Sequence, residues 1–363
     1  MQQQKTVATI TYHRSDNFGS VLQAYALGEK LRQMGYVQYV IDYRRKEVAE
    51  KYQVLRKPTS RYLLMTDCYH LLHYGALKEG QRRFERFRQD CLRLSQKYCE
   101  ENTLRKDPPK ADAYVVGSDQ VWNTDISDFD ESYLLSFVKE GRKIAYAASG
   151  VAALPGDKQE YLKRRIADFD AVSLRENKAA VALEQKKVVL DPVLLLTKQD
   201  WEKICVDTGR KKKYMLCYFA GGVSTEFEMF TRQKARELGL ERVVLMPQWR
   251  NLFRPGVYAY DAGPREFVSL IRDAALVCTN SFHGTAFSIL LNKPFLVGQH
   301  TPFSDDRIST ILGGLKLCGR EIDPANPILP EDLIDMDYSE VNEAIDILRS
   351  DSVSWLRTAI EGE

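Results

Sequence analysis

Residues 275–291, ALVCTNSFHGTAFSILL, predict a short apolar strand, a turn and an apolar helix. Strands and helices that alternate through such short turns are typical of α/β proteins with parallel sheets. The turn holds His283, whose side chain titrates near neutral pH, beside a helix start whose backbone N–H groups attract anions. The sequence therefore predicts a site for an anionic ligand at this turn.

The same alternation surrounds this run and predicts a second α/β domain over residues 196–338. Apolar, β-branched stretches predict strands at 213–219, 242–246 and 294–298. Helical spacing predicts helices at 224–238 and 264–273. The pattern breaks near 192–212, which places the domain boundary there.

The first domain, residues 1–195, begins with a strand, a helix and a second strand. A β-branched run at 6–12 is followed by a polar turn, a helix that ends at Gly35, and a strand at 37–43. This order is typical of a doubly wound parallel sheet, in which ligands bind at the carboxyl ends of the strands. After Pro108 and Pro109, further strands are predicted at 113–116, 143–148, 171–174 and 186–190, with a helix at 157–168.

Residues 44–106 interrupt this alternation and predict a helical insertion. They are rich in Arg, Lys and Tyr and show amphipathic helical spacing at 60–78 and 80–95. Their aromatic side chains either pack helices onto the sheet or contact a sugar or a partner helix. At the other end of the chain, residues 339–363 predict a C-terminal helix that could pack back on the first domain.

Composition excludes several classes of protein. Of the 363 residues, 52 are Lys or Arg and 50 are Asp or Glu, so general affinity for nucleic acid is not expected. Seven cysteines without a CxxC pair indicate reduced core residues of a cytosolic protein. The chain shows no signal-peptide pattern and no apolar run of membrane-spanning length. We therefore expect a cytoplasmic protein, which would have to meet any membrane-linked substrate at the membrane surface.

Two polar loops follow strands of the first domain. In the loop 13–20, Asn17 and Gly19 tolerate unusual backbone angles and Ser20 can cap the next helix; the pattern GxGxxG is absent. In the loop 117–123, polar side chains beside an indole suit a polyol; they are Ser118, Asp119, Gln120 and Trp122. The alternative is that both loops are capped turns, with the tryptophan in the core.

Two arginines and one histidine are candidates for anion chemistry. Arg175 directly follows a predicted strand and could bind a carboxylate or phosphate, or pair with Glu176 or Asp170. Arg307 lies near a predicted helix start, and His283 could transfer a proton or be only structural. No group of His, Cys, Asp and Glu has the spacing of metal ligands, so no metal site is expected.

Five motifs in order resemble one known family, that of the polysaccharide pyruvyl transferases. They are NFGSVLQAYAL at 17–27, VGSDQVW at 116–122, VSLRE at 172–176, DPV at 191–193 and NSFHG at 280–284. The ordered match covers roughly residues 6–320. The resemblance implies two Rossmann-like domains that face each other across a cleft, as in GT-B glycosyltransferases.

The resemblance also implies an activity. The family's donor substrate is phosphoenolpyruvate, no cofactor is needed, and the product is a pyruvate ketal on a sugar of a surface polysaccharide or its lipid-linked precursor. His283 matches the family's catalytic histidine, and Arg175 matches an arginine that holds the donor. In this picture the second domain binds the donor, and the loops of the first domain bind the acceptor through Asn17, Gly19, Ser20, Ser118, Asp119, Gln120 and Trp122.

The donor side departs from the family pattern at one position. Better-described members have an arginine two residues before the histidine, where this chain has Ser281. We expect Ser281, Phe282, Gly284 and Thr285 to surround the donor. Either Arg307, Lys143 or Arg14 supplies the missing charge, or the donor differs.

Two other functions fit the same architecture. One is a glycosyltransferase that uses a nucleotide sugar. The other is a non-catalytic homologue that binds polysaccharide, which the serine at 281 would favour. The sequence predicts neither the acceptor sugar nor the oligomeric state.

Overall fold

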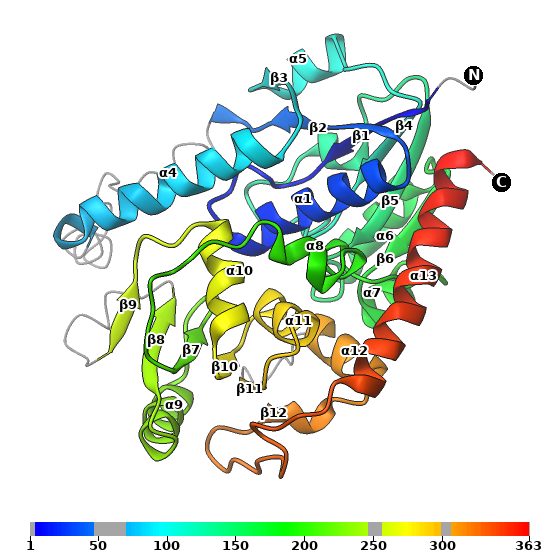
Figure 1. Cartoon of the computed structure of the whole chain (residues 1–363). Coiled ribbons are helices and arrows are strands. Elements are labelled where there is room, and N and C mark those ends of the chain that lie inside the picture. Colours follow the sequence, from blue (N-terminus) through cyan, green and yellow to red (C-terminus); the bar gives the residue numbers. More distant parts are fainter. Residues whose placement is uncertain (1–3, 47–69, 246–255, 299–305, 363) are drawn as a thin grey trace. The chain divides into compact units, whose positions relative to one another are not determined.

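A computed structural model describes residues 4–46, 70–245, 256–298 and 306–362 (Figure 1). The chain divides into two compact units. Unit 1 comprises residues 1–52, 87–196 and 345–363, and unit 2 comprises residues 53–86 and 197–344. Each unit is built around one six-stranded parallel sheet, so the prediction of an α/β chain with two Rossmann-like sheets is confirmed.

The sheet of unit 1 has the strand order β3-β2-β1-β4-β5-β6, and all its pairings are parallel. The strands are β1 (Thr6–Ile10), β2 (Val37–Tyr43), β3 (Leu94–Tyr98), β4 (Ala113–Val116), β5 (Arg142–Ala148) and β6 (Ala171–Leu174). The strands that follow β1, β2 and β3, lie on one side of it, and the strands that follow β4, β5 and β6, lie on the other side of the sheet. Their boundary is the switch point at which such sheets bind ligands, at the carboxyl edge.

Helices cover both faces of this sheet. They are α1 (Phe18–Gln33), α5 (Glu101–Lys106), α6 (Gly156–Ile166), α7 (Asn177–Ala182), the end of α4 (Tyr74–Cys91), most of α13 (Ser339–Glu361), and the 3₁₀ turns η1 (Glu131–Leu134) and η2 (Pro192–Leu195). Successive side chains of a strand point to opposite faces of the sheet. Val115 therefore packs in a core with α1 and α13, and Val116 packs in a core with α5, α6 and α7.

The sheet of unit 2 has the order β12-β11-β10-β7-β8-β9. Its strands are β7 (Tyr214–Tyr218), β8 (Glu241–Leu245), β9 (Val257–Ala259), β10 (Leu276–Thr279), β11 (Phe295–Gly298) and β12 (Glu321–Ile322). Its helices are α8 (Lys198–Glu202), α9 (Thr225–Glu237), α10 (Pro264–Asp273), α11 (Phe282–Leu290), α12 (Asp306–Gly314) and the 3₁₀ turn η4 (Cys318–Arg320). Here the switch point lies between β7 and β10, so the turn after β10 is at the ligand-binding edge.

The predicted helical insertion is wrong at its carboxyl-terminal end. Residues 94–98 form an edge strand and 101–106 a short helix, so the α/β alternation resumes before residue 106. Only Tyr98 of β3 is buried, and a strand this polar gives no apolar signal. The helix α4 is continuous over 74–91, where a break near residue 79 was expected. Residues 47–69 lie outside the described part of the chain.

The helix α13 takes part in the core of unit 1 over most of its length. Leu356 and Ile360 are buried against the sheet, and the Tyr36 hydroxyl donates to Glu361 Oε1 at 2.6 Å. No helix among the described residues is long and apolar enough to cross a membrane. None of the six described cysteines forms a disulfide, and Cys318 is exposed, which corrects its expected place in a core.

Candidate functional site

The turn between β10 and α11 is built by Thr279 and Ser281. The Thr279 hydroxyl donates to the carbonyl of Tyr218 at 2.6 Å and accepts the Ser281 N–H at 3.0 Å. Ser281 is the N-cap of α11, and its hydroxyl accepts the Gly284 N–H at 3.5 Å. The residue that departs from the family pattern therefore stabilises the start of the helix.

His283 is the second residue of α11 and lies beyond the carboxyl end of β10, as predicted. Its side chain is 5% exposed and lies edge-on to the Phe282 ring, with 5.2 Å between centroids. A histidine at this edge, beside a helix start, can exchange a proton with a ligand held there.

Two predicted donor residues lie within the turn, and their contact with the donor stays a prediction. The side chains of Phe282 and Thr285 are buried, and the Thr285 hydroxyl donates to the Ser281 carbonyl at 3.0 Å. The backbone N–H groups of Gly284 and Thr285 are also bound within the turn, to the hydroxyl and the carbonyl of Ser281. Both amides thus have a partner in Ser281.

Asn280, the first residue of the motif NSFHG, also belongs to this edge, and its role does not follow from the motif. Its Oδ1 accepts the Ala220 N–H at 2.8 Å, and its Nδ2 donates to the Gly222 carbonyl at 2.6 Å. The amide thus joins the loop after β7 to the turn after β10, across the switch point. A short amide directly after an apolar strand, one residue before a helix cap, is the signal that could have indicated it.

Gly284 allows α11 to start close to β10. A Cβ atom at this position would lie 2.4 Å from Thr279 Oγ1 and 3.0 Å from Thr279 Cβ. We expect Gly284→Ala to lower the free energy of unfolding by about 1–3 kcal/mol, because the hydroxyl that must move is held by two hydrogen bonds. The measurement is chemical unfolding followed by circular dichroism.

The matched control is Gly313→Ala in α12, where nothing lies within 4 Å of the added Cβ. Alanine has the higher helix propensity, so this variant should be neutral or slightly more stable than the native protein. Equal stability of the two variants would contradict the close approach at Gly284.

Arg175 lies at the corresponding edge of unit 1, directly after β6, and is 3% exposed. Its guanidinium donates to Asp191 Oδ2 at 2.5 Å and to Ser149 Oγ at 2.7 Å. Asp191 also accepts from the Ser118 hydroxyl at 3.1 Å. Neither predicted partner is the main one: Glu176 Oε1 lies 3.9 Å from Nε, and Asp170 pairs with Arg142.

Two side chains of the loop after β4, those of Ser118 and Trp122, lie in the interior of unit 1 rather than at its surface. Ser118 is fully buried, and its N–H donates to Gln23 Oε1 at 3.1 Å. Trp122 is also fully buried and donates its indole N–H to the Tyr133 carbonyl at 3.0 Å. The predictions that these two side chains contact a sugar are wrong, because both belong to the interior of unit 1.

Asp119 and Gln120 are partly exposed, and they remain candidate contacts for the acceptor. Both have left-handed backbone angles, with φ of 51° and 59°. Asp119 Oδ2 accepts from the Ser20 hydroxyl at 2.5 Å, which joins this loop to the start of α1. The exposed Asn17 caps α1 by accepting the Ser20 N–H at 3.2 Å, and Gly19 is buried.

The three predicted substitute cations lie in different surroundings. Lys143 is the second residue of β5, five residues before the carboxyl end at Ala148. Five residues of strand span about 16 Å, so Lys143 lies at the wrong edge of the sheet and its assignment is wrong. Arg14 forms an ion pair with Asp42, and Arg307 is in the first turn of α12.

Buried hydrogen bonds and an ion pair hold the loop 13–20 in place, and the sequence did not indicate them. Arg88 of α4 donates to the carbonyls of His13 and Ser15 at 2.9 and 2.8 Å. His13 Nε2 lies 3.2 Å from Asp42 Oδ1, and burial lowers the pKa of His13. Burial alone would raise the pKa of Asp42, but hydrogen bonds from His13 and Arg14 outweigh it and hold that pKa below its ordinary value.

No cluster of three His, Cys, Asp or Glu side chains able to hold a metal ion occurs among the described residues. The groups assembled at the two sheet edges are a histidine in unit 2 and a buried arginine–aspartate pair with hydroxyls in unit 1. Such groups suit proton transfer and the binding of anions and hydroxyls.

Comparison with known structures shows what fold the chain shares. It is similar to a putative UDP-N-acetylglucosamine 2-epimerase from Listeria monocytogenes, with a TM-score of 0.55, 13% identity, and 99% of this chain and 98% of that chain covered. It is also similar to the UDP-GlcNAc 2-epimerase of Methanocaldococcus jannaschii in complex with UDP-GlcNAc and UDP, with a TM-score of 0.51, 12% identity, and coverage of 96% and 93%. At these identities the likeness shows the fold alone, and it supports the GT-B-like class.

Comparison at the level of sequence is more specific. No curated protein matches the chain. The profile of the family described as polysaccharide pyruvyl transferase matches residues 17–297, which is more than half of the chain and includes both Arg175 and His283. The protein is therefore a transferase that belongs to the polysaccharide pyruvyl transferase family.

Proposed function

We propose that the protein transfers a pyruvyl group from phosphoenolpyruvate to a sugar of a surface polysaccharide or its lipid-linked precursor, forming a pyruvate ketal. The observation that carries the proposal is His283, which follows the central strand β10 at the carboxyl edge and begins α11, within the residues that match the family. We further propose that the reaction takes place in the cytoplasm, with peripheral contact at the inner face of the membrane when the acceptor is lipid-linked.

In the proposed mechanism, His283 as imidazolium gives its proton to the methylene carbon of phosphoenolpyruvate. The adjacent carbon becomes electrophilic, and a sugar hydroxyl forms a bond to it while its proton passes to the now neutral His283. The bond to phosphate then breaks, a second hydroxyl of the same sugar closes the ketal, and the proton of that hydroxyl passes to the departing phosphate. One residue thus serves as acid and then as base, and inorganic phosphate is the second product.

The donor carries a phosphate and a carboxylate, for which cationic partners are needed. We assign Arg175 as one of them, since it lies at the carboxyl edge of unit 1 and is fixed by Asp191 and Ser149. Arg307, in the first turn of α12, is the candidate in unit 2. For the acceptor, we assign Asp119, Gln120 and Asn17, which are partly or fully exposed at the carboxyl edge of unit 1.

The test is mass spectrometry of lipid-linked glycans incubated with the protein and phosphoenolpyruvate. We expect the acceptor mass to rise by one pyruvyl ketal, with one phosphate released for each ketal formed. An acceptor that binds without any change in mass would instead show a non-catalytic homologue.

A thermal-shift experiment separates the remaining alternative, a glycosyltransferase. A ligand that binds only the folded state raises the unfolding temperature. Phosphoenolpyruvate should therefore raise it, and UDP-N-acetylglucosamine at the same concentration should not raise it more. The opposite order would favour a nucleotide-sugar donor.

A further inference from the structure

Gln23 is a polar residue in the interior of unit 1, in the first half of α1. Its neighbours along the helix, Val21, Leu22 and Ala24, are apolar and buried, and the Gln23 side chain is itself fully buried. An amide removed from water lowers stability unless its donors and its acceptor find partners. Packing alone therefore does not explain a glutamine at this position.

Both ends of the Gln23 amide have partners, and the partners come from three separate elements. Nε2 donates to Thr11 Oγ1 at 2.7 Å and to the Ser20 carbonyl at 2.9 Å, and Oε1 accepts the Ser118 N–H at 3.1 Å. Thr11 directly follows β1, Ser20 lies in the first turn of α1, and Ser118 is the second residue after β4. A carbonyl only accepts and a backbone N–H only donates, so a single orientation of the amide satisfies all three partners.

The loop after β4 needs such contacts to keep its backbone conformation. Asp119 and Gln120 have φ angles of 51° and 59°. Residues with a side chain rarely adopt these left-handed angles, and the surrounding contacts must maintain them. Gln23 binds the N–H of Ser118, and the Ser149 hydroxyl accepts the Gln120 N–H at 2.7 Å. These two hydrogen bonds lie on either side of Asp119, so the direction of its carboxylate depends on them.

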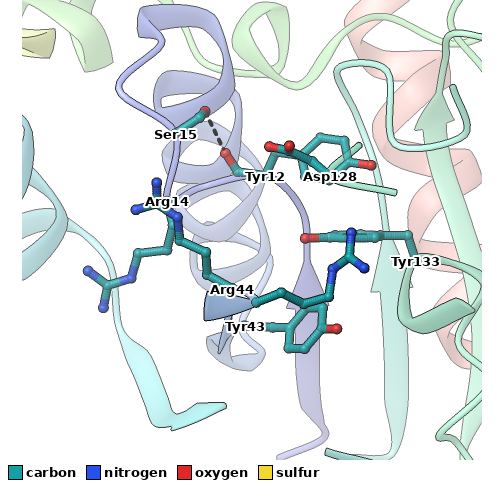
Figure 2. Close-up of a pocket in the computed structure, with 8 residues that line it drawn as sticks. Tyr12, Arg14, Ser15, Tyr43, Arg44, Asp128 and Tyr133 are labelled. Atoms are coloured by element: carbon teal, nitrogen blue, oxygen red, sulfur yellow. Dashed lines mark hydrogen bonds between the residues drawn. The ribbon is translucent and has the colours of Figure 1, made fainter. Parts of the chain in front are cut away.

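Gln23 also acts on Asp119 through the start of α1. Its Nε2 binds the carbonyl of Ser20, and the Ser20 hydroxyl donates to Asp119 Oδ2 at 2.5 Å. The turn in front of α1 has hydrogen bonds of its own, since the Ser15 hydroxyl donates to the Tyr12 carbonyl at 2.9 Å (Figure 2). Gln23 therefore joins the loops after β1 and β4 and contacts both neighbours that orient the carboxylate.

We propose that Gln23 is a positioning residue of the acceptor site. Its amide holds the Asp119 carboxylate where it accepts a hydrogen bond from a hydroxyl of the acceptor sugar, and Gln23 itself does not touch the sugar. The Asp119 side chain is 13% exposed, so a ligand can reach it, whereas Gln23 is fully buried. A hydrogen bond to a carboxylate is strong but depends on direction. The inference rests on the proposed function and deepens it.

The test is Gln23→Met, which keeps the length of the side chain but removes both amide donors and the carbonyl acceptor. We expect KM for the lipid-linked glycan acceptor to rise about tenfold, while kcat and KM for phosphoenolpyruvate stay within about twofold of the native values. The amount of glycan that the immobilised protein retains, measured by mass spectrometry, should fall. Backbone amides of residues 117–123 should exchange hydrogen faster, because the Ser118 N–H loses its acceptor.

Gln38→Met is the matched control. Gln38 is also a buried glutamine of unit 1 that binds a threonine of β1. Its Nε2 donates to Thr9 Oγ1 at 3.1 Å, and its Oε1 accepts from Arg32 Nη1 at 2.9 Å. It is the second residue of β2, at the end opposite the carboxyl edge. This variant should keep the native acceptor KM and the native exchange of residues 117–123. An equal rise of acceptor KM in both variants would overturn the proposal.

A second variant, Ser20→Ala, keeps the proposal falsifiable if Gln23→Met does not fold. It removes the hydroxyl that binds Asp119 and leaves the Ser20 carbonyl that binds Gln23. Acceptor KM should again rise, with KM for phosphoenolpyruvate unchanged. An acceptor KM that stays native in every folded variant would overturn the proposal, because the direction of the Asp119 carboxylate would then not affect the acceptor.

The role of Gln23 and the pyruvyl transfer fail separately. Suppose that the native protein retains the glycans without forming a ketal, and that Gln23→Met retains less of them than Gln38→Met. This result would refute the pyruvyl transfer alone. Ketal formation with the same acceptor KM in Gln23→Met and in the native protein would refute the role of Gln23 alone. A native protein that neither retains the glycans nor forms a ketal would refute both.

Discussion

Replacing His283 with glutamine is expected to lower the rate of phosphate release from phosphoenolpyruvate by about 10²–10⁴-fold, the usual contribution of a general acid or base. Glutamine keeps a polar side chain of similar length but cannot transfer a proton. The measurement is kcat with saturating donor and the acceptor identified by mass spectrometry, together with the unfolding temperature of the variant. Because His283 lies in the first turn of α11 and is 5% exposed, the unfolding temperature is needed to separate catalysis from folding.

His73→Gln is the matched control for this substitution. His73 is also in unit 2 and stacks on Tyr260, with 4.0 Å between ring centroids, but it lies away from the β10–α11 turn in the sequence and belongs to none of the motifs. It should retain the native kcat. A folded His283→Gln protein with the native kcat would contradict the proposed mechanism, whereas equal losses in both variants would indicate a general effect on unit 2.

Asp191→Ala is expected to lower the free energy of unfolding by about 3–5 kcal/mol, because it leaves the buried Arg175 guanidinium without its closest anion. The carboxylate is 1% exposed and also accepts from the Ser118 hydroxyl and from the backbone N–H of Val193. Its removal therefore leaves donors of three residues without this acceptor. Chemical unfolding of the full chain, followed by circular dichroism and by tryptophan fluorescence, measures the change.

Asp346→Ala provides the exposed counterpart of the same kind of pair. Asp346 binds Arg349 on α13, its side chain is 71% exposed, and pairs of this kind contribute less than about 1 kcal/mol. We also expect the double variant Arg175→Met/Asp191→Leu to recover much of the stability lost in Asp191→Ala. It should lack activity, because it removes the arginine proposed to hold the donor. Equal stability of Asp191→Ala and Asp346→Ala would show that Arg175 finds another partner.

The β10–α11 turn shows what local pattern can determine. An apolar strand, a short polar turn and an apolar helix are each specified within a few residues, so the place of His283 at the carboxyl edge followed from the sequence. The strand β3 shows the opposite case. It lies at the edge of the sheet with one buried residue, so its pairing with β2 stabilises a segment whose own composition does not indicate a strand.

The assignment of Lys143 to the donor is wrong for a reason that the sequence already contains. The predicted strand 143–148 already put this residue at the start of a parallel strand, and the carboxyl ends of parallel strands share one edge. The prediction that Trp122 contacts a sugar is wrong for a different reason. A tryptophan in a polar loop is compatible with a sugar-binding face and with a core position. Only the packing of Trp122 against neighbours such as Phe169, distant in the sequence, decides between them.

The sequence by itself determined the two α/β units, the turn that carries His283, and the family to which the chain belongs, because these depend on periodicity and on ordered motifs. The tertiary structure decided the partners. Arg175 pairs with Asp191, and Gln23 accepts the backbone N–H of Ser118. Such pairings depend on which strand ends the sheet brings side by side, and hydrophobic periodicity carries no information about that order.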